Sequence, residues 1–329
     1  MTEELNIIPE DKKNDFLWIL QNRIFRIFNI ITEYGEENFY QSFSGGKDSA
    51  VLYHLIDMAV PGNKIPRVYA DTGIEYRDIR KFVMDMAETD DRIQIIKPTK
   101  NIRRTLEEEG YPFKSKKHSE ALADYQKSGK SKYIRHYLGE FEEGEKPWTF
   151  QSHYCPDSLR YQFTPDFQIK VSDHCCLRMK KDPLKNWQKE NNKQIAIIGL
   201  TRDEGGRRES AKCTIFTKSG KLRSFQPLVP VTKEWENWFI DRYNIKLCRL
   251  YYPPFSFSRT GCKGCPFAPK LQEELEILQQ YLPSEREQCE IIWKPVYEEY
   301  RRIGYRLKDE EQLEFSDLDF SPPEVDENG

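Results

Sequence analysis

The sequence has no long apolar run. No stretch of its 329 residues approaches the roughly 20 consecutive apolar residues that cross a membrane. The opening MTEELNIIPEDKKNDF is acidic and polar, where a secretory leader would be basic and then apolar. We therefore expect a soluble, cytoplasmic protein without a membrane partner.

An excess of charge of one sign is also missing. The chain has 51 Lys and Arg residues against 54 Asp and Glu residues, which gives a formal net charge of -3. The overall balance therefore does not require a nucleic acid or a membrane surface as partner, and any site for a polyanion must be local. The length allows one or two domains with a sizeable core.

Cysteine is too scarce for a disulfide framework. The eight cysteines of this chain are expected to stay thiols in a reducing cytosol. Four of them form two close pairs, Cys175 with Cys176 and Cys262 with Cys265. Clustered thiolates select zinc or an iron–sulfur cluster. Adjacent cysteines suit the separated irons of a cubane better than one tetrahedral zinc ion, which favours [4Fe–4S].

The other cysteines give weaker signals. Cys155, in HYCPD, is the main rival ligand. Cys213, Cys248 and Cys289 lie in strand-like or helix-like stretches, where a small buried thiol is expected.

Strand-like and helix-like stretches alternate along the first 200 residues. Apolar runs at 38–43, 67–72, 92–98 and 193–200 predict strands, and the periodicity at 48–58 and 76–87 predicts helices. This alternation predicts an α/β fold with a parallel sheet. The expected organisation is an N-terminal helix in 1–35, an α/β domain at 36–250 with an insertion at 98–192, a cysteine-containing helical segment at 251–315 and a disordered acidic tail at 316–329.

A glycine-rich loop joins the first strand to its helix. It consists of Ser44, Gly45, Gly46, Lys47, Asp48 and Ser49. Glycines at a helix N-terminus expose main-chain N–H groups to an anion, while lysine and serine add a charge and hydrogen bonds, so the loop predicts a phosphate site. It is not a Walker A loop, which needs four residues between its glycines. The alternative is a simple glycine-rich turn.

SGGKDS in this setting resembles the PP-loop of the ATP pyrophosphatases, which have the Rossmann-like adenine nucleotide α-hydrolase (HUP) fold. With YADTGIEY, IGLTRDEGGRR and FQPLVPVTKEWENWFI, the chain up to about residue 240 is similar to the PAPS reductase family. The resemblance implies that the loop holds pyrophosphate, that Asp71 and Thr72 lie near the adenosine, and that a Gly-x-x-Arg segment contacts the anionic end of the nucleotide. That segment supplies Gly199, Arg202, Arg207 and Arg208. The alternative for these arginines is a solvated loop.

The stretch HCCLRMKKDPL resembles the Cys-Cys motif of assimilatory adenylylsulfate reductases. That resemblance implies that Cys175, Cys176, Cys262 and Cys265 hold one [4Fe–4S] cluster, part of it on the C-terminal helical segment. Those reductases, however, have a degraded loop and end with a Glu-Cys-Gly-x-His segment. This chain keeps the full loop and has no cysteine after Cys289.

These departures favour an ATP pyrophosphatase over a reductase. We expect ATP to be cleaved to AMP and pyrophosphate with Lys47 and Asp48 as catalytic residues, Mg²⁺ on the pyrophosphate, and an acceptor adenylated in sulfur transfer or in nucleotide or nucleic-acid modification. The alternatives are a sulfonucleotide (APS/PAPS) reductase and a noncatalytic nucleotide-binding subunit of a modification or defence complex.

The interval 97–137 mixes Lys and Arg with Tyr and Phe. That mixture is used to follow a phosphate backbone and stack bases, although a lid over the ATP pocket would also explain it. The expected partners are a nucleotide and either a nucleic acid or a sulfur-donor protein, and homodimer formation stays open.

Overall fold

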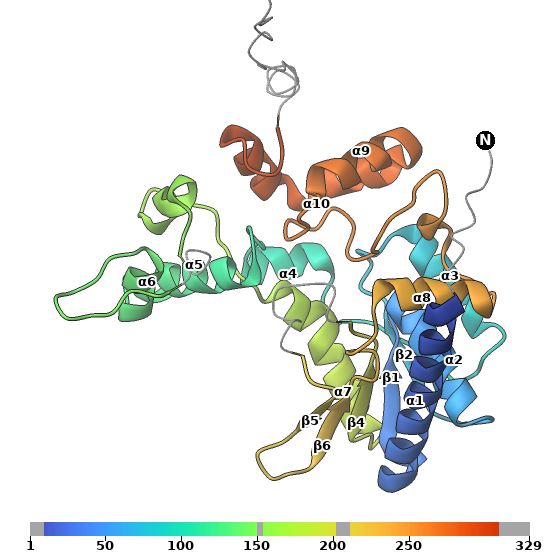
Figure 1. Cartoon of the computed structure of the whole chain (residues 1–329). Coiled ribbons are helices and arrows are strands. Elements are labelled where there is room, and N and C mark those ends of the chain that lie inside the picture. Colours follow the sequence, from blue (N-terminus) through green and yellow to red (C-terminus); the bar gives the residue numbers. More distant parts are fainter. Residues whose placement is uncertain (1–9, 150–153, 202–210, 309–329) are drawn as a thin grey trace, which may run out of the picture. The chain divides into compact units, whose positions relative to one another are not determined.

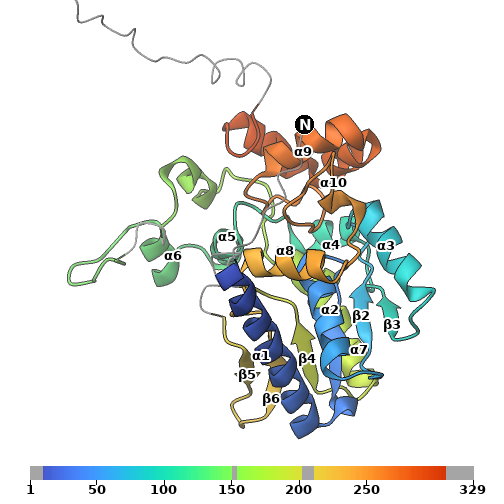
Figure 2. The ribbon, with the colours of Figure 1, turned by 45° about the vertical axis from the view of Figure 1, so that its right-hand side comes forward.

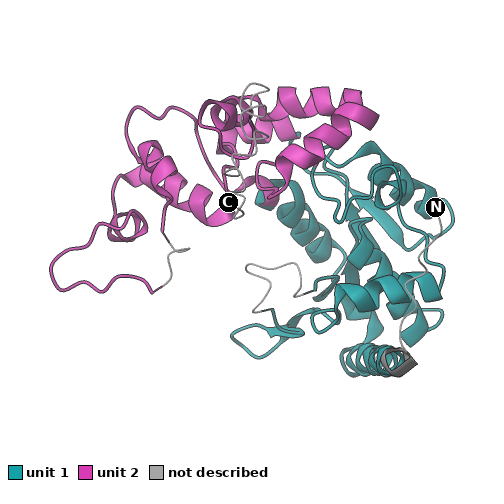
Figure 3. Cartoon of the chain, turned by 45° about the horizontal axis from the view of Figure 1, so that its top comes forward, with its two compact units in different colours: residues 1–101, 177–262 teal, residues 102–176, 263–329 magenta. Residues whose placement is uncertain are grey.

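The structure, a computed structural model, describes residues 10–149, 154–201 and 211–308. The chain forms two compact units, each built from two separate segments (Figure 3). Unit 1 comprises residues 1–101 and 177–262, and unit 2 comprises residues 102–176 and 263–329. The domain boundaries expected from the sequence stay predictions.

A six-stranded sheet forms the centre of unit 1 (Figure 1). Its order is β3-β2-β1-β4-β6-β5, and every neighbouring pair is parallel except β5 with β6. The strands are β1 (Phe39–Ser42), β2 (Arg67–Ala70), β3 (Ile93–Ile96), β4 (Ile195–Ile198), β5 (Thr214–Phe216) and β6 (Leu222–Phe225). The predicted α/β fold with a parallel sheet is therefore confirmed. Two strands were not predicted: β6, which pairs in parallel with β4, and the antiparallel edge strand β5.

Helices cover both faces of this sheet (Figure 2). Phe39 of β1 and Ile197 of β4 pack in one apolar cluster with α1, α2 and α8. Tyr40 of β1 alternates to the other face, where it packs with Trp187 of α7. The helices are α1 (Glu10–Tyr34), α2 (Lys47–Ala59), α3 (Arg77–Ala87), α7 (Asp182–Glu190) and α8 (Lys233–Arg242), with short turns η1 (Glu36–Asn38), η4 (Leu177–Lys181) and η7 (Arg249–Tyr251).

Local signals explain where several of these helices begin. Thr232 caps α8, because its hydroxyl accepts a hydrogen bond from the Trp235 N–H. The apolar spacing from Phe16 to Tyr34 predicts the first helix, and α1 begins six residues before Phe16, in a charged stretch. No helix in the described ranges is both long enough and apolar enough to cross a membrane.

Unit 2 is helical and has an aromatic core. Its elements are α4 (Ile102–Glu109), α5 (Lys116–Ser128), α6 (Lys132–Tyr137), η3 (Asp157–Phe163), α9 (Leu271–Tyr281) and α10 (Pro283–Arg302). The rings of Phe113 and Tyr300 lie 4.6 Å apart. The fully buried His118 ring lies 6.0 Å from the ring of Phe113 and 5.7 Å from that of Phe163 in η3. The His118 ring nitrogens contact Tyr137 Oη at 3.0 Å and Gln162 Oε1 at 2.7 Å.

Candidate functional site

The loop between β1 and α2 has a backbone shaped for glycine. Gly45 has a φ of 70°, in the left-handed region, and a Cβ on it would lie 2.7 Å from Val83 Cγ2. Gly46 is extended (φ -83°, ψ 169°) and caps α2, whose first helical bond runs from Ala50 N to Gly46 O at 3.0 Å. The N-terminus of a thirteen-residue helix therefore opens directly onto the loop, where its dipole favours an anion.

Two serine hydroxyls hold the loop in this shape. Ser49 is buried, and its Oγ donates to Gly46 O at 2.8 Å and lies 3.0 Å from Ser44 Oγ. Ser44 is exposed and accepts a hydrogen bond from the Gly46 N–H at 3.3 Å. Ser44 can therefore turn toward a ligand, whereas Ser49 acts mainly by shaping the turn.

Lys47 carries the positive charge of the site. Its ammonium donates to Asn237 Oδ1 at 3.2 Å and lies 5.6 Å from the centre of the Tyr251 ring. No carboxylate in the described part of the chain forms an ion pair with it. Its main-chain N–H donates to Tyr251 Oη at 3.0 Å, and that hydroxyl lies 2.6 Å from Thr260 Oγ1.

Sequence reasoning missed Asn237, Tyr251 and Thr260 as loop partners. Asn237 lies on α8, and the other two lie in the aromatic segment that follows it. Burial raises the pKa of Tyr251, so its hydroxyl keeps its proton at neutral pH. A neutral hydroxyl can accept from an amide and also donate to a phosphate oxygen.

The sheet brings other predicted residues to the same edge as the loop. Gly199 directly follows β4, and a Cβ on it would lie 2.8 Å from Asp48 O. The first turn of α2 therefore packs against the main chain at the end of β4. Strand order reverses between β1 and β4, and such a reversal is where open α/β sheets bind ligands.

Asp71 and Thr72 follow β2 at this edge. The Asp71 carboxylate forms an ion pair with Arg80 at 3.0 Å. The N–H and hydroxyl of Thr72 both donate to Glu75 Oε2, at 3.1 and 2.7 Å, and Lys180 Nζ lies 3.1 Å from Glu75 Oε1. These contacts fix the turn after β2. The predicted Arg202, Arg207 and Arg208 lie outside the described residues.

The predicted metal ligands fall in different units. Unit 1 holds Cys262, whose backbone pairs with that of Glu75, and unit 2 holds Cys175, Cys176 and Cys265. None of the eight cysteines, all within the described ranges, forms a disulfide. Among the described residues no group of three or more His, Cys, Asp or Glu side chains is arranged to hold a metal ion. The four-cysteine site stays a prediction.

Within unit 2, helix α10 fixes the loop around Cys265. Three ring side chains on one face of α10 donate to the loop carbonyls: Trp293 to Lys263 O at 3.1 Å, Tyr297 to Gly264 O, and Tyr300 to Pro266 O at 2.9 Å. Gly264 has a φ of 57°, and a Cβ on it would overlap Tyr297 Oη and lie 2.7 Å from Cys289 Sγ. The conformation of the loop is thus set by packing.

The Lys263 ammonium, buried beside this loop, is paired. It lies 3.3 Å from Glu285 Oε2 and 2.7 Å from Gln288 Oε1. Within unit 2, Cys265 lies on this preformed loop, and Cys175 and Cys176 directly precede the π-helical turn η4. Thiolates are the donors that zinc and iron–sulfur clusters prefer, so the donor chemistry of the predicted cysteines suits such a group. Cys289 is fully buried, and burial raises its pKa to about 12, which confirms the expected buried thiol.

Comparison with known proteins identifies the family. Residues 38–268 match the phosphoadenosine phosphosulfate reductase domain. An uncharacterized protein of Methanocaldococcus jannaschii is 31% identical over 230 residues, which are 69% of this chain and 41% of that protein. Adenosine 5'-phosphosulfate reductase of Deinococcus radiodurans is 27% identical over 113 residues, which are 34% of this chain and 43% of the reductase. The chain thus spans about two fifths of the length of these relatives.

Two solved structures have a similar arrangement of elements at low identity. Phosphoadenylyl-sulfate reductase from Candida auris, in a phosphate complex, has a TM-score of 0.39 at 14% identity and covers 73% of this chain and 93% of its own. A U34-tRNA thiolase from Methanococcus maripaludis, with its [4Fe-4S] cluster, has a TM-score of 0.35 at 13% identity and covers 85% of this chain and 78% of its own. Neither similarity carries an argument about chemistry. The domain match, which spans more than half of the chain, shows that the protein belongs to the phosphoadenosine phosphosulfate reductase domain family.

Proposed function

We propose that the chain is an ATP pyrophosphatase that adenylates an acceptor in sulfur transfer or in nucleotide or nucleic-acid modification. One observation carries the proposal: the head of α2 combines a left-handed Gly45, an extended Gly46 and a Lys47 ammonium that has no carboxylate partner among the described residues. Such a loop suits two linked phosphoryl groups, because main-chain donors, a helix dipole and a lysine act on the same anion.

Each loop group has a definite part in this reaction. The amides of Gly46 and Lys47, which now donate to hydroxyls, would donate to phosphate oxygens instead. Lys47 would neutralise charge on the departing pyrophosphate. Asp48, in the first turn of α2, would hold Mg²⁺ directly or through water, because Mg²⁺ prefers oxygen ligands. An acceptor oxygen would attack the α-phosphorus, and the bond to the bridging oxygen would break and release pyrophosphate. A second nucleophile, a sulfur donor or water, would then attack the adenylated acceptor and displace AMP.

The four paired cysteines would hold the cluster. Cys175, Cys176, Cys262 and Cys265 supply four thiolate donors, the number that a [4Fe–4S] cluster takes. A bound cluster would bring iron and sulfide to the reaction. Arg178 and Lys180 closely follow Cys175 and Cys176 in the sequence. Both already form ion pairs, Lys180 with Glu75 and Arg178 with Asp182, so their positive charges are partly neutralised and would offset less of the negative charge of a thiolate-bound cluster.

Product analysis tests the nucleotide chemistry. The protein, purified without oxygen, should release AMP and pyrophosphate from ATP and Mg²⁺ in the presence of an acceptor, and Lys47→Ala should abolish most of that release. Release of ADP and orthophosphate alone would refute the proposal. ATP that is bound and left intact with every acceptor offered would indicate a noncatalytic nucleotide-binding subunit.

Iron and sulfide counting tests the cluster separately. Cys262→Ser should lose iron and sulfide and the visible absorbance, whereas Cys213→Ser, which changes a thiol outside the predicted set, should keep them. Equal iron content in both variants would refute the ligand assignment.

Similarity to the Deinococcus reductase favours sulfonucleotide reduction as the second candidate. That chemistry needs an exposed, reactive thiolate. Cys289 does not suit it, because the thiol is buried within α10 and its pKa is raised to about 12. Sulfite formed from adenylylsulfate and a thiol donor would establish this candidate in place of the first.

A further inference from the structure

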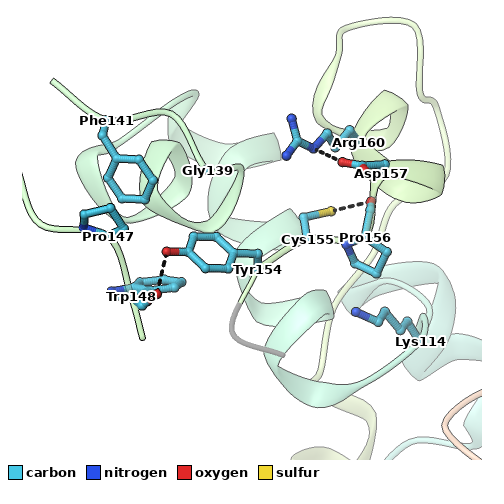
Figure 4. Close-up of a pocket in the computed structure, with 10 residues that line it drawn as sticks. All are labelled: Lys114, Gly139, Phe141, Pro147, Trp148, Tyr154, Cys155, Pro156, Asp157 and Arg160. Atoms are coloured by element: carbon cyan, nitrogen blue, oxygen red, sulfur yellow. Dashed lines mark hydrogen bonds and ion pairs between the residues drawn. The ribbon is translucent and has the colours of Figure 1, made fainter. Parts of the chain in front are cut away.

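Unit 2 contains a cavity of about 740 Å³, which is large enough for a nucleotide. Aromatic side chains line one side, Arg160 and Lys114 lie on the other, and Cys155 lies between them (Figure 4). We propose that this cavity binds one base and its phosphate from a single-stranded nucleic acid. The inference rests on the proposed function in that it supplies the class of acceptor.

The aromatic side offers a prepared stacking surface. The rings of Trp148 and Tyr154 lie 5.5 Å apart at 39°, and Tyr154 Oη donates to Trp148 O at 2.9 Å, which ties the two residues together. Phe141 meets Tyr154 edge to face at 6.1 Å. Lys117 Nζ lies 4.9 Å from the centre of the Trp148 ring. An aromatic surface of this kind accepts any base, because every base has a π face.

Lys114 gives the opposite side an available positive charge. No carboxylate in the described ranges forms an ion pair with its ammonium, which lines the cavity. Its backbone is left-handed (φ 56°), an unusual state for lysine, and its N–H donates to the buried Tyr300 Oη at 2.7 Å. Residues held in such conformations by their surroundings are concentrated at functional sites.

Arg160 supplies a second positive charge. It pairs with Asp157 at 2.9 Å, but the Asp157 side chain is 91% exposed, so this surface pair is weak and a phosphate can replace the carboxylate. Planar guanidinium groups bind two phosphate oxygens at once. A ligand that fills the cavity should therefore combine a flat aromatic ring with an anion.

Cys155 shapes the floor of the cavity and does not act as a nucleophile. It is 3% exposed, its Sγ lies 3.5 Å from Pro156 O, and burial raises its pKa to about 11. The thiol therefore stays neutral at neutral pH and does not repel a phosphate. Its position beside the bound base would instead limit how deeply a ring can enter.

Two sources could supply a base with a phosphate: a single-stranded nucleic acid or a free mononucleotide. The surrounding segment favours the first. Helices α5 and α6 carry further lysines and an arginine outside the cavity, which can follow a backbone beyond one phosphate. These are Lys116 and Lys127, which form no ion pair with the described residues, and Lys132 and Arg135, which pair with Glu145 and Glu142.

Fluorescence anisotropy of a labelled oligothymidine, titrated with the full chain at several salt concentrations, tests the proposal. Trp148→Leu should weaken binding roughly tenfold without changing the salt dependence, because stacking is lost. Lys114→Met should weaken binding and reduce the slope of log K against log salt by about 0.7, because one phosphate contact is lost. Trp18→Leu, at an exposed tryptophan, and Lys64→Met, at an exposed lysine, both lie in unit 1; they are the matched controls and should bind normally.

Absence of oligothymidine binding, or equal binding by all four variants, would overturn the proposal. Binding of AMP that depends on Trp148, without binding of the oligomer, would overturn the nucleic-acid source and establish a mononucleotide site.

Lys47→Ala separates this result from the fate of the proposed function, because it should lose pyrophosphate release and keep oligothymidine binding. Oligomer binding without any pyrophosphate release by the wild type would refute the proposed function and leave the cavity assignment standing.

Discussion

Lys47 allows the charge of the loop to be removed with little effect on folding. Lys47→Met loses one hydrogen bond to Asn237 and the contact with the Tyr251 ring, and it breaks no ion pair with the described residues. An exposed contact between a cation and a ring contributes about 0.5–1 kcal/mol and an exposed hydrogen bond a similar amount, so we expect the free energy of unfolding to fall by no more than about 2 kcal/mol.

The expected effect on ATP is much larger. A hydrogen bond to a charged group contributes about 1.5–3 kcal/mol, which corresponds to a loss of affinity of roughly 10- to 150-fold. Titration calorimetry with a non-hydrolysable ATP analogue and Mg²⁺ measures this loss, and a thermal melt measures the change in stability.

Asn237→Ala is the matched control, because it removes the same hydrogen bond and keeps the ammonium. Its affinity for the analogue should change less than about threefold, since only a neutral partner is lost. The reasoning is refuted if Lys47→Met melts normally and binds the analogue within twofold of the wild type, or if the two variants lose affinity equally.

Three further changes test the geometry of the two units. Gly45→Ala should raise the KM for ATP and lower the melting temperature, because its Cβ would lie 2.7 Å from Val83 Cγ2. The control is Gly62→Ala, where φ is 75° and no atom lies within 4 Å of the added Cβ; it should show only the backbone cost of about 1 kcal/mol. Gly264→Ala should reduce iron content and stability, because the added Cβ would overlap Tyr297. The control is Gly129→Ala, where φ is 74° and no atom lies within 4 Å of the added Cβ; equal iron content in the two variants would contradict the packing argument. Burial lowers the pKa of His118 to about 4, so below about pH 6.5 the unfolded chain binds a proton that the folded chain does not. The free energy of unfolding, measured by urea titration, should therefore fall by up to about 3 kcal/mol between pH 6.5 and 4. An equal loss in His118→Gln would disprove this cause.

Much of unit 1 could be predicted because its signals are local. Each expected parallel strand is present with slightly shorter bounds, since the expected ranges include flanking polar residues such as Asp71, Lys97 and Lys193 that lie outside the strands. The hairpin of β5 and β6 was missed although TKSGK, a turn signal around Gly220, lies between two strand-like stretches. The extension of α1 to Glu10 was missed because periodicity reports only the apolar face of a helix.

The partners of the loop could not be predicted, because the fold brings them from far along the chain. Tyr251 lies 204 residues from Lys47, and only the tertiary structure places its hydroxyl at the loop. The same holds for α10: its periodicity predicts an apolar face, but nothing in the sequence shows that ring side chains on this face donate to the carbonyls after Cys262.

The hydrogen bonds within the loop explain how it can be stable alone and still bind an anion. The amides of Gly46 and Lys47 donate to Ser44 Oγ and Tyr251 Oη, so the folded loop does not leave these donors unsatisfied. Both acceptors are neutral hydroxyls, and a hydrogen bond to a phosphate oxygen is about twice as strong as one to a neutral oxygen. Replacement by phosphate is therefore favourable, and the displaced hydroxyls can rotate and donate to the same anion. Tyr251→Phe should consequently reduce loop stability and ATP affinity together, whereas a hydroxyl that only blocked the site would give tighter binding when removed.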